Sequence, residues 1–216
     1  MQNQTDDLSA RLRQRKTLNV GILVFPDVEV LDFAGPFEVF SVAARVAARD
    51  SALSEPPFRV STVAAERAVV TARHGLKVVP QFGFGDQPPI DLLVVPGGVV
   101  TQPLHCAATL TWVRAAAART SVTAAVCTGA FILAKAGLLE GRAVTTHWED
   151  IADLRRMFPR LRVLEGTPFV DEGAVVTSAG ISAGIEMSLH LVGRTLGAAL
   201  AQATARQMEY NWSPRL

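Results

Sequence analysis

One cysteine stands where a buried strand is expected to turn into a helix. Residues 121–126, SVTAAV, are typical of a buried strand, and residues 128–139, TGAFILAKAGLL, follow with helical spacing. A thiol on such a turn, a nucleophile elbow, projects from the sheet at the amino end of the helix. Free amides and the helix dipole there would lower the pKa of Cys127 below about 8.5. The alternative is a small buried hydrophobe, because free cysteine is among the most buried residue types.

Two other strand ends carry residues that suit the same chemistry. Asp32 stands in an otherwise apolar stretch, VEVLDFAGPFEVF. It is either the amino-terminal cap of the following helix or a carboxyl beside the thiol, where burial would raise its pKa and suit it to proton transfer. Gly97 and Gly98 follow LLVVP, and their amides could form an oxyanion hole or only a turn. Ligands collect at the carboxyl ends of parallel strands, so these residues are expected near Cys127.

The histidines, Cys106 and two glutamates are weaker candidates for the site than the residues above. His147 follows a short strand predicted over 142–147 in the same sheet, and it is either a neighbour of the site or a structural histidine. Cys106 and Cys127 lie far apart without a CxxC motif or clustered histidines, which predicts neither a metal site nor a disulfide. The remaining histidines are expected to be structural, and two helical glutamates are expected either near the site or facing solvent: His74, His105, His190, Glu38 and Glu186.

Strand and helix patterns alternate along the chain, which predicts an α/β fold with a mostly parallel sheet sandwiched by helices. Strands are expected over 18–25, 57–64, 90–98, 121–126 and 142–147, with hairpins over 69–81 and 169–180. Helices are expected over 33–49, 108–119, 128–139, 148–158, 182–197 and 198–211. Residues 1–17 are interpreted as a flexible tail, and residues 18–216 as a single domain.

Composition narrows the function classes. Hydrophobic residues make up 49% of the chain and charged residues 19%, which favours a large core. The net charge of +1 argues against nucleic acid or an anionic membrane as a general partner. The chain has no apolar run of about 18 residues and no secretory signal, so a soluble, cytoplasmic protein that does not enter a membrane is expected.

Four stretches together resemble the ThiJ/PfpI superfamily, which has the class I glutamine-amidotransferase-like fold, a flavodoxin-like architecture. They are LDFAGPFEVF, LLVVPGG, AVCTGAFILAKAGLLEGRAVTTHW and GISAGIEMSLHLV. The resemblance runs from about residue 18 to residue 205, and it is strongest to isonitrile (isocyanide) hydratases and to the amino-terminal domains of AraC-type regulators. The last expected helix lies close to residue 216, so no helix-turn-helix domain is expected and the hydratase branch is favoured.

The hydratase resemblance implies roles for individual residues. Cys127 would be the nucleophile, Asp32 and Thr128 its companions, and Gly98 and Gly97 the donors of backbone amides. The thiolate would attack the terminal carbon of R–N≡C while a proton reaches nitrogen, and water would then release an N-substituted formamide. The implied partners are a small-molecule substrate and a second copy of the chain in a homodimer, with no cofactor or metal.

Two departures from other branches of the superfamily support this prediction. Protease-like members place a histidine directly after the cysteine, where this chain has Thr128. Relatives of the Parkinson's-associated protein use a glutamate where this chain has Asp32. The alternatives that stay open are a cysteine-based stress or redox sensor and a glyoxalase- or deglycase-type activity.

Overall fold

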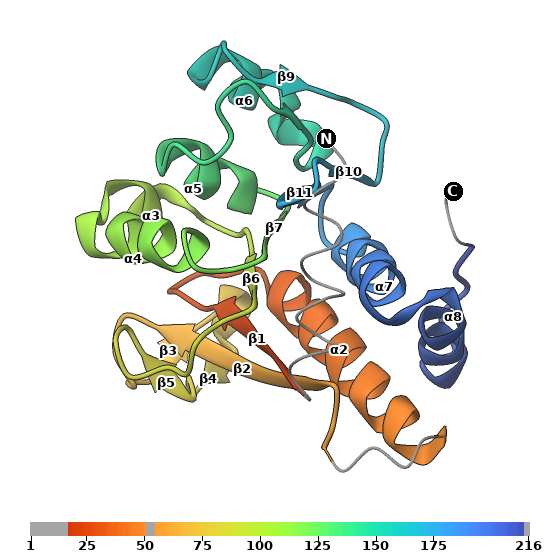
Figure 1. Ribbon diagram of the computed structural model, residues 1–216. Helices are drawn as coiled ribbons and strands as arrows, with labels where there is room; N and C mark the ends of the chain where they lie inside the picture. The colour runs from red at the N-terminus through yellow and green to blue at the C-terminus, as the bar shows by residue number, and fades with distance from the viewer. Residues whose placement is uncertain (1–16, 51–54, 214–216) are drawn as a thin grey trace.

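The computed structural model describes residues 17–50 and 55–213 (Figure 1). Over these residues the central sheet has seven strands in the order β10-β11-β7-β6-β1-β2-β5. Neighbouring strands are parallel except for β10, which runs antiparallel to β11 at one edge. The prediction of a mostly parallel sheet is confirmed. The expected tail over 1–17 lies, except for Thr17, outside the described residues.

The central strands are continuous apolar runs, as strands covered on both faces require. Every side chain of β6 and β7 is buried. The strands of this sheet are β1 (Leu18–Leu23), β2 (Phe58–Ala64), β5 (Phe82–Gly83), β6 (Leu92–Val95), β7 (Val122–Val126), β10 (Phe169–Asp171) and β11 (Val175–Ser178). The hairpin expected over 169–180 is confirmed by the antiparallel pairing of β10 with β11.

Two small sheets flank the central one. The hairpin expected over 69–81 is present as β3 (Val70–Thr71) and β4 (Lys77–Val78), joined through the short 3-10 helix η1 (Arg73–Gly75). The strand expected over 142–147 was wrongly placed in the central sheet. Its extended part, β8 (Ala143–Val144), pairs instead with β9 (Arg162–Val163), because β10 already occupies the free edge of β11.

Helices cover both faces of the sheet (Figure 1). The long helices α2 (Val30–Asp50), α7 (Ala183–Leu196) and α8 (Ala198–Gln207) pack together on one face, at the right of the view. The other face carries α3 (Thr101–His105), α4 (Ala107–Ala117) and α5 (Gly129–Lys135). The stretch expected as one helix over 148–158 divides into η2 (Trp148–Asp150) and α6 (Ile151–Met157).

The first helix begins earlier than its Gly-Pro pair suggested. Helix α2 starts at Val30 and contains Pro36, whose missing N–H leaves the carbonyl of Asp32 without its usual helical donor. Asp32 is therefore the third residue of the helix rather than its cap, so the capping interpretation is wrong. No helix of the described part of the chain is both long and apolar enough to cross a membrane.

Candidate active site

Cys127 occupies a strained turn between β7 and α5. Its φ is 57°, a left-handed conformation that costs an ordinary L-residue about 1–2 kcal/mol. Besides the hydrogen bond from the Ala130 amide to the Cys127 carbonyl (3.3 Å), three hydrogen bonds to more distant segments fix this backbone. The Cys127 amide donates to the carbonyls of Ser178 (3.2 Å) and Ala179 (3.3 Å), and the Cys127 carbonyl accepts from Thr146 Oγ1 (2.8 Å). The elbow is thus held between the ends of β11 and the segment after β8.

Asp32 is fully buried and points at the loop after β6. Its Oδ2 accepts a hydrogen bond of 3.0 Å from the Gly97 amide, while Oδ1 is buried without a partner in the described residues. A side chain on residue 97 would not fit, since a Cβ there would lie 2.5 Å from Thr128 Oγ1 and 2.9 Å from Asp32 Oδ2. Glycine at this position lets Asp32 and Thr128 approach the same peptide.

The hydroxyl of Thr128 forms two hydrogen bonds with the backbone of Gly98. It donates to the Gly98 carbonyl (3.0 Å) and accepts from the Gly98 amide (2.9 Å). The amides of Gly97 and Gly98, expected to face a ligand, therefore donate to Asp32 and to Thr128. Because each of these amides already has a protein acceptor, the two amides hold the side chains of Asp32 and Thr128 beside Cys127.

The pKa of Asp32 is raised, as expected, whereas the pKa of Cys127 is raised although it was expected to be lowered. Burial raises the pKa of Asp32 to about 7, and the charge of Glu29 adds to the rise while the Gly97 amide opposes it. Burial and, after it, the charge of Asp32 together raise the pKa of Cys127 to about 12. The hydrogen bond from the Thr128 amide lowers this pKa but does not offset the rise. The resting nucleophile is a protonated thiol.

The expected low pKa of Cys127 was wrong for a physical reason. The thiol is only 7% exposed, so its anion would lose most of its hydration, and a carboxylate lies beside it. Helix α5 has seven residues, which limits what its dipole can offset.

The ring of His147 lies against Gly180, next to Ala179, whose carbonyl accepts from the Cys127 amide. His147 directly follows Thr146, which binds the Cys127 carbonyl, and a Cβ on Gly180 would lie 3.1 Å from the His147 Nε2. His147 Nδ1 is 3.4 Å from Asp150 Oδ2. Sequence reasoning missed Asp150, whose charge also raises the pKa of Cys127. Its only sequence signal was the spacing of three residues from His147.

The other candidates lie in different settings. His190 Nε2 bonds Asp171 Oδ2 at 2.7 Å on the outer part of α7, which fits the structural role expected of it. Glu38 is exposed, as one of its two interpretations held. Cys106 and Cys127 are both free thiols. In the described ranges, no group of three or more histidine, cysteine, aspartate or glutamate side chains could hold a metal ion.

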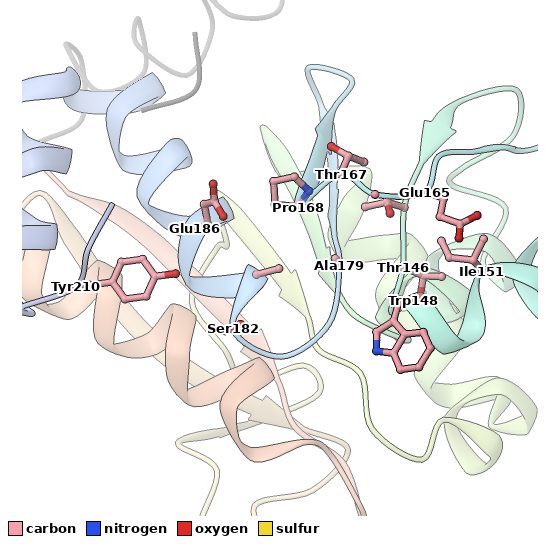
Figure 2. A pocket seen from close by; sticks show the side chains of 13 residues that line it. Thr146, Trp148, Ile151, Glu165, Thr167, Pro168, Ala179, Ser182, Glu186 and Tyr210 are labelled. Atoms are coloured by element: carbon pink, nitrogen blue, oxygen red, sulfur yellow. The ribbon is translucent and has the colours of Figure 1, made fainter. Parts of the chain in front are cut away.

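A cavity of about 350 Å³ lies next to the elbow (Figure 2). Thr146 and Ala179, which line it, are two of the residues that bind the Cys127 backbone. Figure 2 shows Trp148 on one side of the cavity and Tyr210 and Glu186 on the other. The lining combines apolar and polar groups, and the volume suits a small molecule.

The sequence profile of the DJ-1/PfpI family matches residues 19–194, most of the chain. The chain belongs to the DJ-1/PfpI family. Among curated relatives of this DJ-1/PfpI protein, the isonitrile hydratase of Pseudomonas putida is 35% identical over 198 residues, which cover 91% of this chain and 80% of the hydratase. The resemblance inferred from the four sequence stretches is confirmed.

Other relatives of this DJ-1/PfpI protein are regulators. The HTH-type transcriptional regulator GbdR of Pseudomonas aeruginosa is 30% identical over 92% of this chain, which spans only 52% of the regulator. The crystal structure of a ThiJ/PfpI family protein from Pseudomonas syringae has a TM-score of 0.79 and 28% identity, covering 93% of this chain and 78% of that one. The family therefore contains both an enzyme and regulators related to this chain.

Proposed function

We propose that this protein is a cysteine-dependent hydratase that adds water to small isocyanides and releases N-substituted formamides. The observation that carries the proposal is a buried carboxyl with a pKa of about 7 beside a protonated thiol on a strained elbow. Near neutral pH, Asp32 exists in both protonation states, so it can take a proton from sulfur and return it to a substrate. The related hydratase supports the choice of substrate.

The first step forms a carbon–sulfur bond. As Cys127 Sγ bonds the terminal carbon of R–N≡C, the thiol proton passes to the Asp32 carboxylate. Asp32 then returns that proton to the former terminal carbon, not to nitrogen as first expected, which gives a thioimidate, R–N=CH–S–Cys127. Sulfur gains one bond to carbon and loses one to hydrogen, so no oxidant or reductant takes part. Because Cys127 rests as an uncharged thiol, the buried site holds no sulfur anion that would need hydration before the substrate binds.

The second step adds water. Water bonds the thioimidate carbon, one of its protons goes to nitrogen, and collapse of the adduct breaks the carbon–sulfur bond. The products are R–NH–CHO and the restored thiol. Thr128, whose backbone amide favours the sulfur anion, stabilises the departing sulfur. The substituent R would lie in the cavity beside the elbow, which Thr146 and Ala179 line but Cys127 and Asp32 do not.

The sensor alternative has less support. A redox-sensing cysteine needs an exposed thiol with a low pKa, whereas Cys127 is 7% exposed and burial raises its pKa to about 12. An assay with methylglyoxal distinguishes a glyoxalase- or deglycase-type activity from the hydratase, because the former would convert methylglyoxal to lactate.

An isocyanide assay tests the proposal. We expect wild-type protein to convert at least one member of an alkyl and aryl isocyanide panel to its formamide. Cys127→Ala should lower kcat/KM on the order of 10³-fold or more, and Asp32→Asn about 10²-fold or more. Cys106→Ala, the matched control, should keep full activity. Absence of formamide across the whole panel would exclude this substrate class.

The expected homodimer, the small-molecule partner and the cytoplasmic location belong to the same proposal. The family relationship supports the homodimer, and the hydratase relative and the cavity volume support the small-molecule partner.

A further inference from the structure

The β3–β4 hairpin is fastened to the segment that leads into α2. The amide of Asp27 donates to the carbonyl of Thr71 (2.9 Å), and the amide of Arg73 donates to the carbonyl of Val28 (3.1 Å). A side-chain contact joins the same two segments, since Arg73 Nη1 lies 3.1 Å from Glu29 Oε2. The hairpin therefore holds the backbone of this segment by hydrogen bonds and places a positive charge beside Glu29.

The segment also holds the peptide that binds Asp32. The amide of Glu29 donates to the Gly97 carbonyl (2.9 Å), and the amide of Gly97 donates to Asp32 Oδ2 (3.0 Å). Val28 and Gly98 form an antiparallel bridge alongside. Glu29 directly precedes the first residue of α2, three positions before Asp32, and its charge acts on the Asp32 carboxyl.

We propose that Arg73 is a positioning residue that acts on Asp32 through its ion pair with Glu29, by compensating the negative charge that Glu29 places at the start of α2. This inference rests on the proposed function, in which the ionised form of Asp32 accepts the thiol proton. Arg73 acts from a separate hairpin and touches neither Asp32 nor Cys127 in the reaction described above.

The sign of the effect follows from like-charge repulsion. After burial, the charge of Glu29 is the strongest influence that raises the pKa of Asp32. Loss of the guanidinium leaves that charge uncompensated and disfavours the Asp32 carboxylate further. The side chain of Arg73 is 43% exposed and that of Glu29 20%, so water and salt screen the pair and keep the effect modest.

Few other charges act on Asp32 in the part of the chain that the structure describes. Cys127 faces it from the elbow and is an uncharged thiol at neutral pH. Asp150 acts from η2 on Cys127. The backbone groups of Gly97 and Ile181 also lower the pKa of Asp32, and substitution of Arg73 changes neither residue.

The test is a direct titration of Asp32 by carbon-13 NMR of its carboxyl in the full chain. We expect Arg73→Met to raise the Asp32 midpoint by about half a pH unit and Glu29→Gln to lower it by a similar amount. Arg73→Lys, which keeps the charge, should restore most of the wild-type midpoint. In the Glu29→Gln background, Arg73→Met should shift the midpoint by less than half as much as in wild type.

Activity gives a second readout. If isocyanides are substrates, the acidic limb of the kcat/KM profile should move with the NMR midpoint in each variant. Arg156→Met is the matched control, because it breaks an exposed ion pair with Asp153 (2.8 Å) on α6 and should leave the Asp32 midpoint unchanged.

The outcomes separate the two proposals. An Asp32 midpoint that Arg73→Met moves by less than ~0.1 unit, while Glu29→Gln moves it, overturns the role of Arg73. A midpoint that neither variant moves overturns it as well. If Arg73→Met fails to fold, Arg73→Gln replaces it, with the same expected shift. A shifted midpoint in a protein that hydrates no isocyanide supports the inference and removes the proposed function.

Discussion

Asp32 and Cys127 share a site in which neither negative charge is well hydrated. The carboxyl is fully buried, one of its oxygens has no partner in the described residues, and its pKa rises to about 7. The thiol beside it keeps its proton for the same reason. Such an arrangement costs stability at neutral pH and is therefore typical of a site that moves protons.

Asp32→Asn should stabilise the protein above pH 7. The folded-state pKa of Asp32 lies above the unfolded value, so its contribution to stability is fully present below about pH 4 and is lost as pH rises through 7. Asparagine is neutral throughout and avoids this loss. We expect a higher Tm for the variant at pH 8 and nearly equal Tm values at pH 4, measured by calorimetry. A lower Tm for Asp32→Asn at pH 8 would contradict this account.

At the scale of elements, the edge strand β10 depends on charged side chains from α7. Asp171 accepts hydrogen bonds from Arg194 Nη1 at 2.8 Å and contacts His190 Nε2 at 2.7 Å. Burial raises the pKa of Asp171, but His190 and Arg194 lower it more, to about 2. A three-residue edge strand has few ladder hydrogen bonds, so this contact ties it to the helix.

Asp171→Asn should destabilise the protein by about 1–2 kcal/mol at pH 7. Because the folded-state pKa of Asp171 lies below the unfolded value, its contribution is present above about pH 4 and is lost as pH falls through 2. Urea unfolding at pH 7 and at pH 3 measures the difference, which should shrink at the lower pH. Asp153→Asn on α6 is the matched exposed control and should change stability by less than about 0.5 kcal/mol.

For the whole molecule, the site exists only when distant segments meet. The elbow after β7 is held by residues that follow β11 and β8, and its carboxyl partner comes from the first turn of α2. Folding must bring all of these together before the strained backbone of Cys127 is stable. The reactivity of the thiol should therefore report global unfolding.

Alkylation of Cys127 should accelerate only when the protein unfolds. Unfolding exposes the thiol and returns its pKa from about 12 toward 8.5, which raises the thiolate fraction at pH 8 by roughly 2,000-fold. In a Cys106→Ser background, iodoacetamide labelling across a urea series should have the same midpoint as circular dichroism. Rapid labelling well below that midpoint would show that the native thiol is accessible and ionised.

Much of the fold could be predicted from local patterns. Continuous apolar runs predicted β1, β6 and β7, and turn residues predicted the hairpins 69–81 and 169–180. Short elements such as α3 and β5 escaped prediction, because a few residues show no periodicity. The start of α2 was missed because the Gly-Pro pair looked like a beginning, whereas the helix admits Pro36 in its early turns.

The sequence alone determined which residues gather at the candidate site, since parallel strands bring their carboxyl ends to one edge and Asp32, Gly97 and Cys127 each stand near such an end. Only the tertiary structure decided their charge states and contacts. The pKa of Cys127 depends on how completely distant segments exclude water from the thiol, and the glycine amides found protein acceptors that no local pattern records. Burial and charge proximity are properties of the packed chain, which is why the thiol, expected as an anion, is protonated.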